Sequence, residues 1–237
     1  MLADDSSVTV TDISRSLKVS TVTVRNDLHS LEDQGFIVRV RGGALPVFHQ
    51  SILDRQREKS AEKDRIAKAA ASLVSDGDTI MIEAGTTTAL VAKYLLGKRN
   101  IHVVTNSSLI LRYARTNPSL HLNLTGGEFR PMTESFVGSI ALRDLERFHV
   151  RYAIVGTDGF SIDNGLTTHL VEGAEIVRMM SSRAEQTILV ADTSKYNRAG
   201  FASVLPLSEI NIIITDGEIA ATERKQIEEL GIEIRIA

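Results

Sequence analysis

The sequence predicts two domains: a small winged helix-turn-helix over residues 1–50 and a larger α/β domain with a mostly parallel sheet over residues 51–237. In the first part, two short stretches with helical apolar spacing meet across a brief turn, and a β-branched run with a glycine turn follows them. In the second part, short β-branched runs alternate with helical ones. That alternation is typical of parallel sheets covered by helices on both faces.

Composition narrows the class of protein. The chain has 237 residues, of which 43% are hydrophobic, so it can bury a sizeable core. A net charge of −3 excludes a globally basic nucleic-acid coat, although a small DNA-binding module needs only one positive face. The absence of cysteine excludes a disulfide framework and a thiolate metal site. Because there is no basic-then-apolar leader and no bilayer-length apolar run, we expect a soluble cytoplasmic protein with no membrane partner.

A capping pattern predicts the first helix. Thr9 and Asp12 have the spacing of a capping box with Asp in place of the usual Glu, and Ile13 and Leu17 follow at helical spacing. A tight connection at Lys18-Val19 then ends this helix.

The second helix has the composition of a DNA-recognition helix. Its apolar stripe consists of Val24, Leu28 and Leu31, and Ser20 is its predicted cap. The first-turn face away from the stripe carries small, methyl-bearing, amide and guanidinium groups, which suit base edges and phosphates. The candidate DNA-binding residues of this helix are Ser20, Thr21, Val22, Thr23, Arg25 and Asn26.

A strand and a glycine turn over residues 36–43 predict a wing. Arg39 and Arg41 are two positions apart, so both lie on one face of the strand and join the candidate DNA-binding set. The alternative is a small helical subdomain whose arginines are simply solvated, because helix-turn-helix patterns also arise by accident.

These residues resemble the winged helix-turn-helix of the DeoR family of bacterial repressors of sugar metabolism. The resemblance joins three motifs in one order: Ser20-Thr21-Val22-Thr23-Val24-Arg25-Asn26-Asp27-Leu28, Leu31-Glu32-x-x-Gly35 and Arg41-Gly42-Gly43-Ala44. It implies a repressor that binds operator DNA. Family members usually carry one more helix before Val8, so the resemblance also implies a truncated domain that lacks part of its hydrophobic core.

A charged and then alanine-rich segment follows the wing. Residues 44–50, which include Pro46, are the predicted linker. The charged stretch from Asp54 to Asp64 merges into a helix that reaches Val74 and has a narrow apolar face. This helix either packs on the surface of the next sheet or, as the family pattern implies, connects the domains and helps to pair subunits.

Seven short runs are the predicted strands of the larger domain. They cover residues 79–82, 101–104, 120–124, 152–155, 187–190, 211–214 and 232–236. Ligands of such sheets bind beyond the carboxyl ends of the strands, so the residues after each run are the candidates for a binding site.

Small, hydroxyl, amide and carboxylate groups follow five of these runs. After the first run, Gly85 would let an anion approach the first amides of a helix while threonine hydroxyls donate to it. The alternative is that Thr86 or Thr87 merely caps an ordinary helix. The candidate effector-binding residues are Glu83, Gly85, Thr86, Thr87, Thr88, Thr105, Asn106, Ser107, Gly126, Gly127, Asp158, Gly159 and Lys195.

This larger part of the chain also resembles the DeoR family. The family's sensor domain is similar in fold to ribose-5-phosphate isomerase and glucosamine-6-phosphate deaminase and binds a phosphorylated sugar. The resemblance therefore implies a ribose-5-phosphate-isomerase-like sensor domain with a phosphorylated sugar as its effector. The family often has Asp in the first loop where this chain has Glu83.

Two other functions compete with the sensor. A sugar-phosphate isomerase would need a general base and a partner that moves the oxygen protons, and Glu83, Asp158 and Lys195 could take those roles. A ligand-free oligomerising scaffold would fill the same loops with its own side chains. The sensor is preferred because the same chain carries a DNA-reading module and shows no separate acid/base constellation.

The sequence also leads to expectations about metals, cofactors and subunit contacts. The histidines at positions 102, 121, 149 and 169 have no metal-ligand spacing, so no metal or cofactor site is predicted. A homo-oligomer, either dimer or tetramer, is expected because one short helix-turn-helix reads too few bases for useful specificity. Its candidate contacts are the helix over residues 58–74 and the exposed sheet edges of the larger domain.

Overall fold

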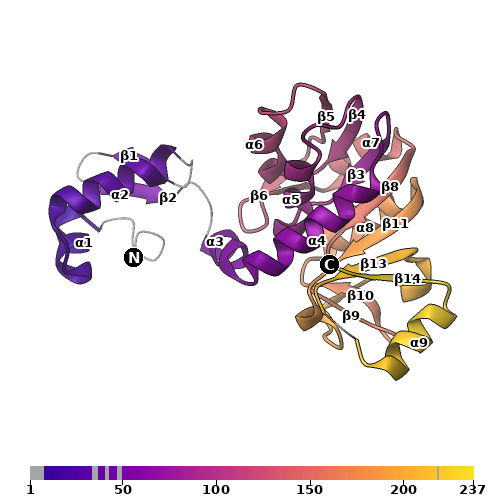
Figure 1. Ribbon diagram of the computed structural model, residues 1–237. Helices are drawn as coiled ribbons and strands as arrows, with labels where there is room; N and C mark the ends of the chain where they lie inside the picture. Colours follow the sequence, from indigo (N-terminus) through magenta and orange to yellow (C-terminus); the bar gives the residue numbers. More distant parts are fainter. Residues whose placement is uncertain (1–7, 34–36, 41–42, 47–49, 218) are drawn as a thin grey trace. The chain divides into compact units, whose positions relative to one another are not determined.

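The computed structural model describes residues 8–33, 37–40, 43–46, 50–217 and 219–237. The chain divides into two compact units after Arg57, and each is considered by itself (Figure 1). No helix in these described ranges is both long and apolar enough to cross a membrane.

The smaller unit contains the predicted helix pair and wing. Its elements are α1 (Val10–Leu17), α2 (Thr21–Asp33), β1 (Ile37–Val40), β2 (Gly43–Pro46) and α3 (Gln50–Arg57). The predicted capping box is confirmed, because the backbone N–H of Asp12 donates to the Thr9 hydroxyl at 3.2 Å and that of Thr9 donates to the Asp12 carboxylate at 3.1 Å. Lys18, with a left-handed φ of 54°, ends α1.

A small core holds this unit together. Its buried members are Ile13, Val24, Leu28, Ile37 and Ala44. Leu31 was expected in the same stripe but is 37% exposed and does not belong to this core. The predicted linker is shorter than expected, because Ala44 to Pro46 pair with β1 across an antiparallel hairpin. Residues 47–49 of that linker lie outside the described part of the chain.

The larger unit is built on a seven-stranded sheet in the order β14-β13-β11-β8-β3-β4-β5 (Figure 1). All neighbouring strands are parallel, and each predicted run forms one of them. The strands are β3 (Thr79–Ile82), β4 (Ile101–Thr105), β5 (Leu120–Leu124), β8 (Val150–Val155), β11 (Ala184–Val190), β13 (Ile212–Thr215) and β14 (Glu233–Ile236).

Helices cover both faces of this sheet. Side chains alternate between the faces along a strand, and Met81 and Val104 belong to a core that also contains Leu145 and Val177 from the helices of one face. The opposite face is covered by two helices that pack on each other, α4 and α5. The helices are α4 (Ser60–Leu73), α5 (Thr86–Tyr94), α6 (Leu111–Ala114), α7 (Ser139–Glu146), α8 (Val171–Ser182) and α9 (Ala221–Glu229).

Two smaller sheets flank the main one. An antiparallel hairpin is formed by β6 (Glu128–Arg130) and β7 (Ser135–Val137). A three-stranded sheet in the order β12-β10-β9 is formed by β9 (Gly159–Ser161), β10 (Gly165–Thr168) and β12 (Ala202–Leu205). Three short 3-10 helices, η1 (Ser108–Ile110), η2 (Thr193–Lys195) and η3 (Leu207–Glu209), complete the described elements.

Candidate functional site

The strand order places a topological switch point at the carboxyl edge of the main sheet, and we call the region around it the crevice. From β3 the chain proceeds to β4 and β5 on one side, whereas β8 lies on the other side and leads to β11, β13 and β14. The connections that follow β3 and β8 therefore lead to opposite halves of the sheet, and ligands of α/β sheets bind at such a switch point. These loops contain the predicted residues Glu83, Gly85 and Asp158.

The helix that follows β3 begins without a side-chain cap. Gly85 is the N-cap residue of α5 and, as a glycine, has no side chain that could cap the first-turn amides. Thr88 is fully buried and donates its hydroxyl to the Gly85 carbonyl oxygen at 3.0 Å, whereas Thr86 and Thr87 are half-buried. The uncapped amides and these two hydroxyls are the groups of this loop that suit an anion.

Glu83 ties the two walls of the crevice together. Its carboxylate accepts a hydrogen bond from the backbone N–H of Gly156 at 3.2 Å. Its own backbone N–H donates to the carbonyl oxygen of Ile154 at 3.0 Å. The side chain at this position therefore fixes the spacing of the loops after β3 and β8.

Asn106 supports the neighbouring loops through its side chain and is not an open ligand group. It is 2% exposed, its side-chain oxygen accepts from the backbone N–H of Ala84 at 2.9 Å, and its side-chain nitrogen donates to the Phe136 carbonyl oxygen at 3.1 Å. Thr105 has a comparable role, because its hydroxyl donates to the Ile82 carbonyl oxygen at 2.6 Å. Together they hold the loop before α5 against β4 and β7.

Two buried hydroxyls on the β4 and β5 side of this edge have no hydrogen-bond partner among the described residues. They belong to Ser107, after β4, and Thr125, after the neighbouring strand β5. Buried hydroxyls are usually paired, so these two are candidate ligand contacts. Thr125 was not in the predicted effector-binding set, although its position directly after a strand was the signal that could have placed it there.

The predicted glycines shape the loops around the crevice. A Cβ atom on Gly127 would lie 2.5 Å from the Val137 carbonyl oxygen, and one on Gly159 would lie 2.3 Å from the Arg198 carbonyl oxygen. The backbone N–H of Gly126 donates to the Asp144 carboxylate at 2.9 Å. These residues permit close backbone packing beside the site.

The remaining predicted residues lie on the β8 and β11 side of the crevice. Asp158 accepts from the Thr168 hydroxyl and from the backbone N–H of His169, both at 2.9 Å. Lys195 ends η2, after β11, and is half-buried. From β5 to β11 there are four strand spacings, about 19 Å, so Lys195 and Gly126 lie at opposite ends of the row of predicted residues.

The predicted DNA-binding residues lie on the smaller unit. Val22 is 60% exposed, and Thr23, Arg25 and Asn26 are exposed with it on α2. Thr21 is half-buried, Arg39 is exposed on β1, and Arg41 lies outside the described residues. Ser20 has a structural role as well, since its hydroxyl accepts from the backbone N–H of Thr23 at 3.0 Å and so caps the helix.

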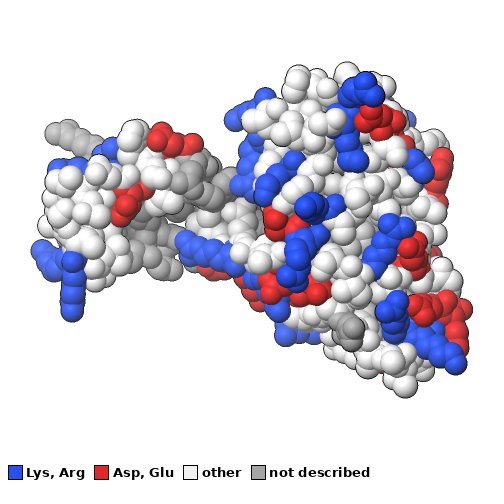
Figure 2. All heavy atoms as spheres, viewed as in Figure 1, with Lys and Arg blue, Asp and Glu red and all other residues white. Residues whose placement is uncertain are grey.

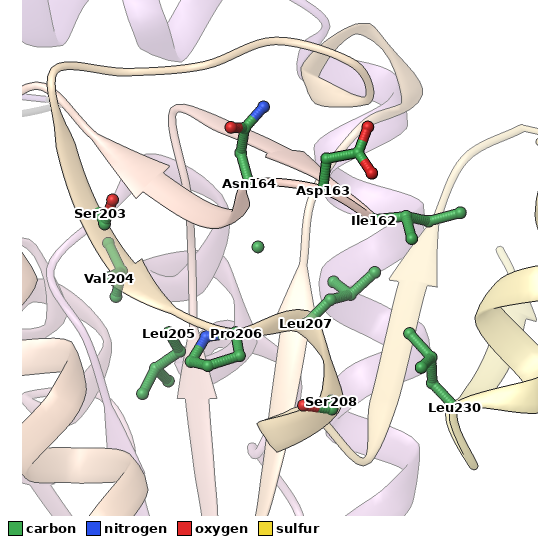
Figure 3. A pocket seen from close by; sticks show the side chains of 11 residues that line it. Ile162, Asp163, Asn164, Ser203, Val204, Leu205, Pro206, Leu207, Ser208 and Leu230 are labelled. Carbon is green, nitrogen blue, oxygen red and sulfur yellow. The ribbon is translucent and has the colours of Figure 1, made fainter.

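A separate cavity of about 380 Å³ lies between the β9–β10 turn and the segment after β12 (Figure 3). Asp163 and Asn164 lie on one side of it and Pro206 and Leu207 on the other, and Leu230 also lines it. It contains none of the predicted effector-binding residues. Its lining includes one carboxylate and no basic side chain, which does not suit a phosphate.

Neither the charged residues nor the metal-ligand residues of the larger unit indicate a further site. Its visible face intersperses basic and acidic side chains (Figure 2). Within the described ranges, no three His, Asp or Glu residues gather in a way that could hold a metal ion.

Comparison with known families decides the assignment. Residues 1–48 match the DeoR-like helix-turn-helix domain, and residues 58–217 match the DeoR C terminal sensor domain. The chain belongs to the DeoR family. The exposed face of α2 is therefore that of a DeoR-like helix-turn-helix, and the crevice lies in a DeoR sensor domain.

Relatives cover nearly the whole DeoR-family chain. The HTH-type transcriptional repressor GlcR of Bacillus subtilis is 36% identical over 213 residues, which are 88% of this chain and 82% of GlcR. The HTH-type transcriptional regulator GlpR of Haloferax volcanii is 33% identical over 238 residues, 99% of this chain and 93% of GlpR. Ribose 5-phosphate isomerase A of Methanocaldococcus jannaschii, at 18% identity and a TM-score of 0.42 over 59% of this chain and 55% of the isomerase, is only distantly similar.

Proposed function

We propose that this DeoR-family protein represses a carbohydrate-utilisation operon and that a phosphorylated sugar controls its affinity for operator DNA. One observation carries the proposal: a single chain joins an exposed recognition helix to a sensor domain whose switch-point helix begins without a side-chain cap. The first part supplies contact with DNA, and the second supplies a site for an anionic ligand.

The sugar phosphate would place its phosphate at the start of α5. The uncapped amides, Thr86 and Thr87 are the donors there, and the dipole of the helix favours a negative charge. The buried hydroxyl of Ser107 lies on the adjacent strand end. The sugar hydroxyls would face Glu83 and the loop after β8, and Lys195 would add positive charge that a neutral sugar does not require.

The hydrogen bonds of the two carboxylates favour a sensor over an isomerase. A general base needs its carboxylate aimed at the carbon to be deprotonated. Glu83 and Asp158 instead accept hydrogen bonds from backbone N–H groups of the loops that shape the crevice. A sensor binds sugar phosphates without converting them, so incubation with aldose and ketose phosphates should give no turnover in the absence of DNA.

Control of DNA affinity requires that the ligand favours one arrangement of the linked domains. A coupling free energy of about 1–3 kcal/mol between the two sites is the usual scale. The protein would act in the cytoplasm as a homo-oligomer, because paired recognition helices read two half-sites and so gain specificity.

A calorimetric comparison tests the effector site. Sugar phosphates should bind the protein, and the unphosphorylated parent sugars should not. Thr86→Val should weaken phosphate-dependent binding, whereas Thr116→Val, at an exposed threonine that follows α6, should leave it unchanged. Equal binding of sugars and sugar phosphates, or normal binding by Thr86→Val, would refute the proposed site.

Operator binding tests the recognition helix. Arg25→Ala should weaken binding by about 1–3 kcal/mol if the guanidinium reads a guanine, and less, with a strong salt dependence, if it contacts phosphate. Arg65→Ala changes an exposed arginine of α4 and is the matched control. Unchanged operator affinity of Arg25→Ala at low salt would contradict the assignment.

A further inference from the structure

We propose that two copies of this chain pair through strand β5, edge to edge and antiparallel, about a two-fold axis at Leu122. The surface involved is the free edge of β5 (Leu120–Leu124). The inference goes beyond the proposed function, because neither the helix-turn-helix nor the effector crevice identifies which part of the sensor domain forms the subunit contact.

The edge of β5 is open within the described structure. β5 and β14 are the two ends of the seven-stranded sheet, and β5 has a strand neighbour only at β4 (Figure 1). Backbone donors and acceptors on the outer side of an edge strand remain available for another strand.

The two edges of the sheet differ in how they are protected. β14 carries Glu233 and Arg235, which form an ion pair at 2.6 Å, and charged side chains discourage pairing with another strand. β5 reads Leu-His-Leu-Asn-Leu and has no charged side chain, no proline and no break in its register with β4. The protective devices of an edge strand are therefore missing from β5.

The sequence of β5 is nearly the same in both directions about Leu122. An antiparallel two-fold pairing would place leucine opposite leucine and His121 opposite Asn123, with no like charges in contact. A two-fold interface requires this kind of self-complementarity, because the same surface is used by both subunits. A second copy of this chain therefore fits the edge.

Apolar and aromatic groups flank the same edge. Leu122 and Leu124 are only half-buried, and Ile140 on α7 is 51% exposed beside Gly126. The ring of His121 stacks on that of His102 with centroids 4.6 Å apart, which holds one side of the strand in place. Pairing would cover the leucines and continue the sheet across the two subunits.

Sedimentation of the full chain tests the proposal. The protein should be at least dimeric at micromolar concentration, and Asn123→Lys, which puts a charge on the β5 edge, should raise the dimer Kd about tenfold or more. The matched control, Ile236→Lys, puts the same charge on a 44% exposed residue of β14 and should leave the Kd unchanged. A monomeric parent, or equal Kd values for parent and Asn123→Lys, would overturn the proposal.

Cysteine cross-linking provides a second measurement that does not depend on the folding of the lysine variant. The chain contains no cysteine, so Leu122→Cys introduces a single thiol at the two-fold axis. Facing residues of an antiparallel pair are close enough for a disulfide after small adjustments. Under mild oxidation Leu122→Cys should form a covalent dimer and Ile236→Cys should not. The reverse pattern, or no cross-linking of Leu122→Cys, would assign the contact to another surface, and neither result bears on effector or operator binding.

Discussion

Replacing Asn106 with alanine should both destabilise the sensor domain and weaken effector binding. The change removes the acceptor of the Ala84 N–H and the donor to the Phe136 carbonyl oxygen. A buried polar group that loses its partner costs about 1–3 kcal/mol. Because Ala84 and Phe136 are half-buried and water can reach them in part, we expect a total loss of about 2–4 kcal/mol in the free energy of unfolding.

Urea unfolding followed by circular dichroism measures this loss directly. Gln226→Ala removes an exposed amide from α9 and should change the free energy of unfolding by less than about 0.5 kcal/mol. Calorimetry with sugar phosphates should show weaker binding by Asn106→Ala, because Asn106 positions the loop that begins α5. If Asn106→Ala unfolds at the same urea concentration as the parent, the hydrogen bonds of this side chain do not stabilise the fold.

Two further predictions concern stability. Gly165 has φ +62° and a Cβ there would lie 2.1 Å from the Leu205 carbonyl oxygen, so Gly165→Ala should cost about 2–5 kcal/mol in urea unfolding. Gly231→Ala, with φ +82° and open space around it, should cost only about 1–2 kcal/mol, and equal losses would contradict the steric argument. The Tyr94 hydroxyl holds the pKa of Asp64 below its ordinary value of 3.8, so the charged carboxylate stabilises the folded state at neutral pH. Water screens this half-exposed group, so Asp64→Asn should lower the free energy of unfolding by less than about 1 kcal/mol at pH 7. The difference between variant and parent should disappear as the pH falls through the lowered pKa of Asp64. If the hydrogen bond is unimportant, variant and parent should be equally stable at every pH.

The centre of the main sheet could be predicted from the sequence because its strands are short, mostly β-branched runs that are buried on both faces. Predicted runs such as 79–82 and 211–214 are too short for a helix and rich in β-branched residues, so they indicate strands. The hairpin β6–β7 and the sheet β12-β10-β9 were missed, because three-residue strands such as Gly159–Ser161 have no measurable alternation and depend on partners elsewhere in the chain.

It was easier to predict which residues lie at the candidate site than what each of them contacts there. Position after a strand placed Glu83, Asn106 and Lys195 on the carboxyl edge. It could not show that Asn106 bonds to groups 22 and 30 positions away, because such partners are chosen only when the chain folds. For the same reason the burial of Thr88 and the unpaired hydroxyl of Thr125 became visible only in the structure.

The central position of β3 has a consequence for how the molecule is made. Its contact with β8 joins groups 73 positions apart, whereas β3, β4 and β5 follow one another along the chain. During synthesis the β3–β5 half can pair as soon as it leaves the ribosome, but the long-range docking of β8 must wait and is intrinsically slower. Since the loops after β3 and β8 are the two walls of the crevice, we expect a nascent chain to be unable to recognise a sugar phosphate until β8 has docked on β3. Only chains in which β8 has docked on β3 would then respond to the nutritional state of the cell.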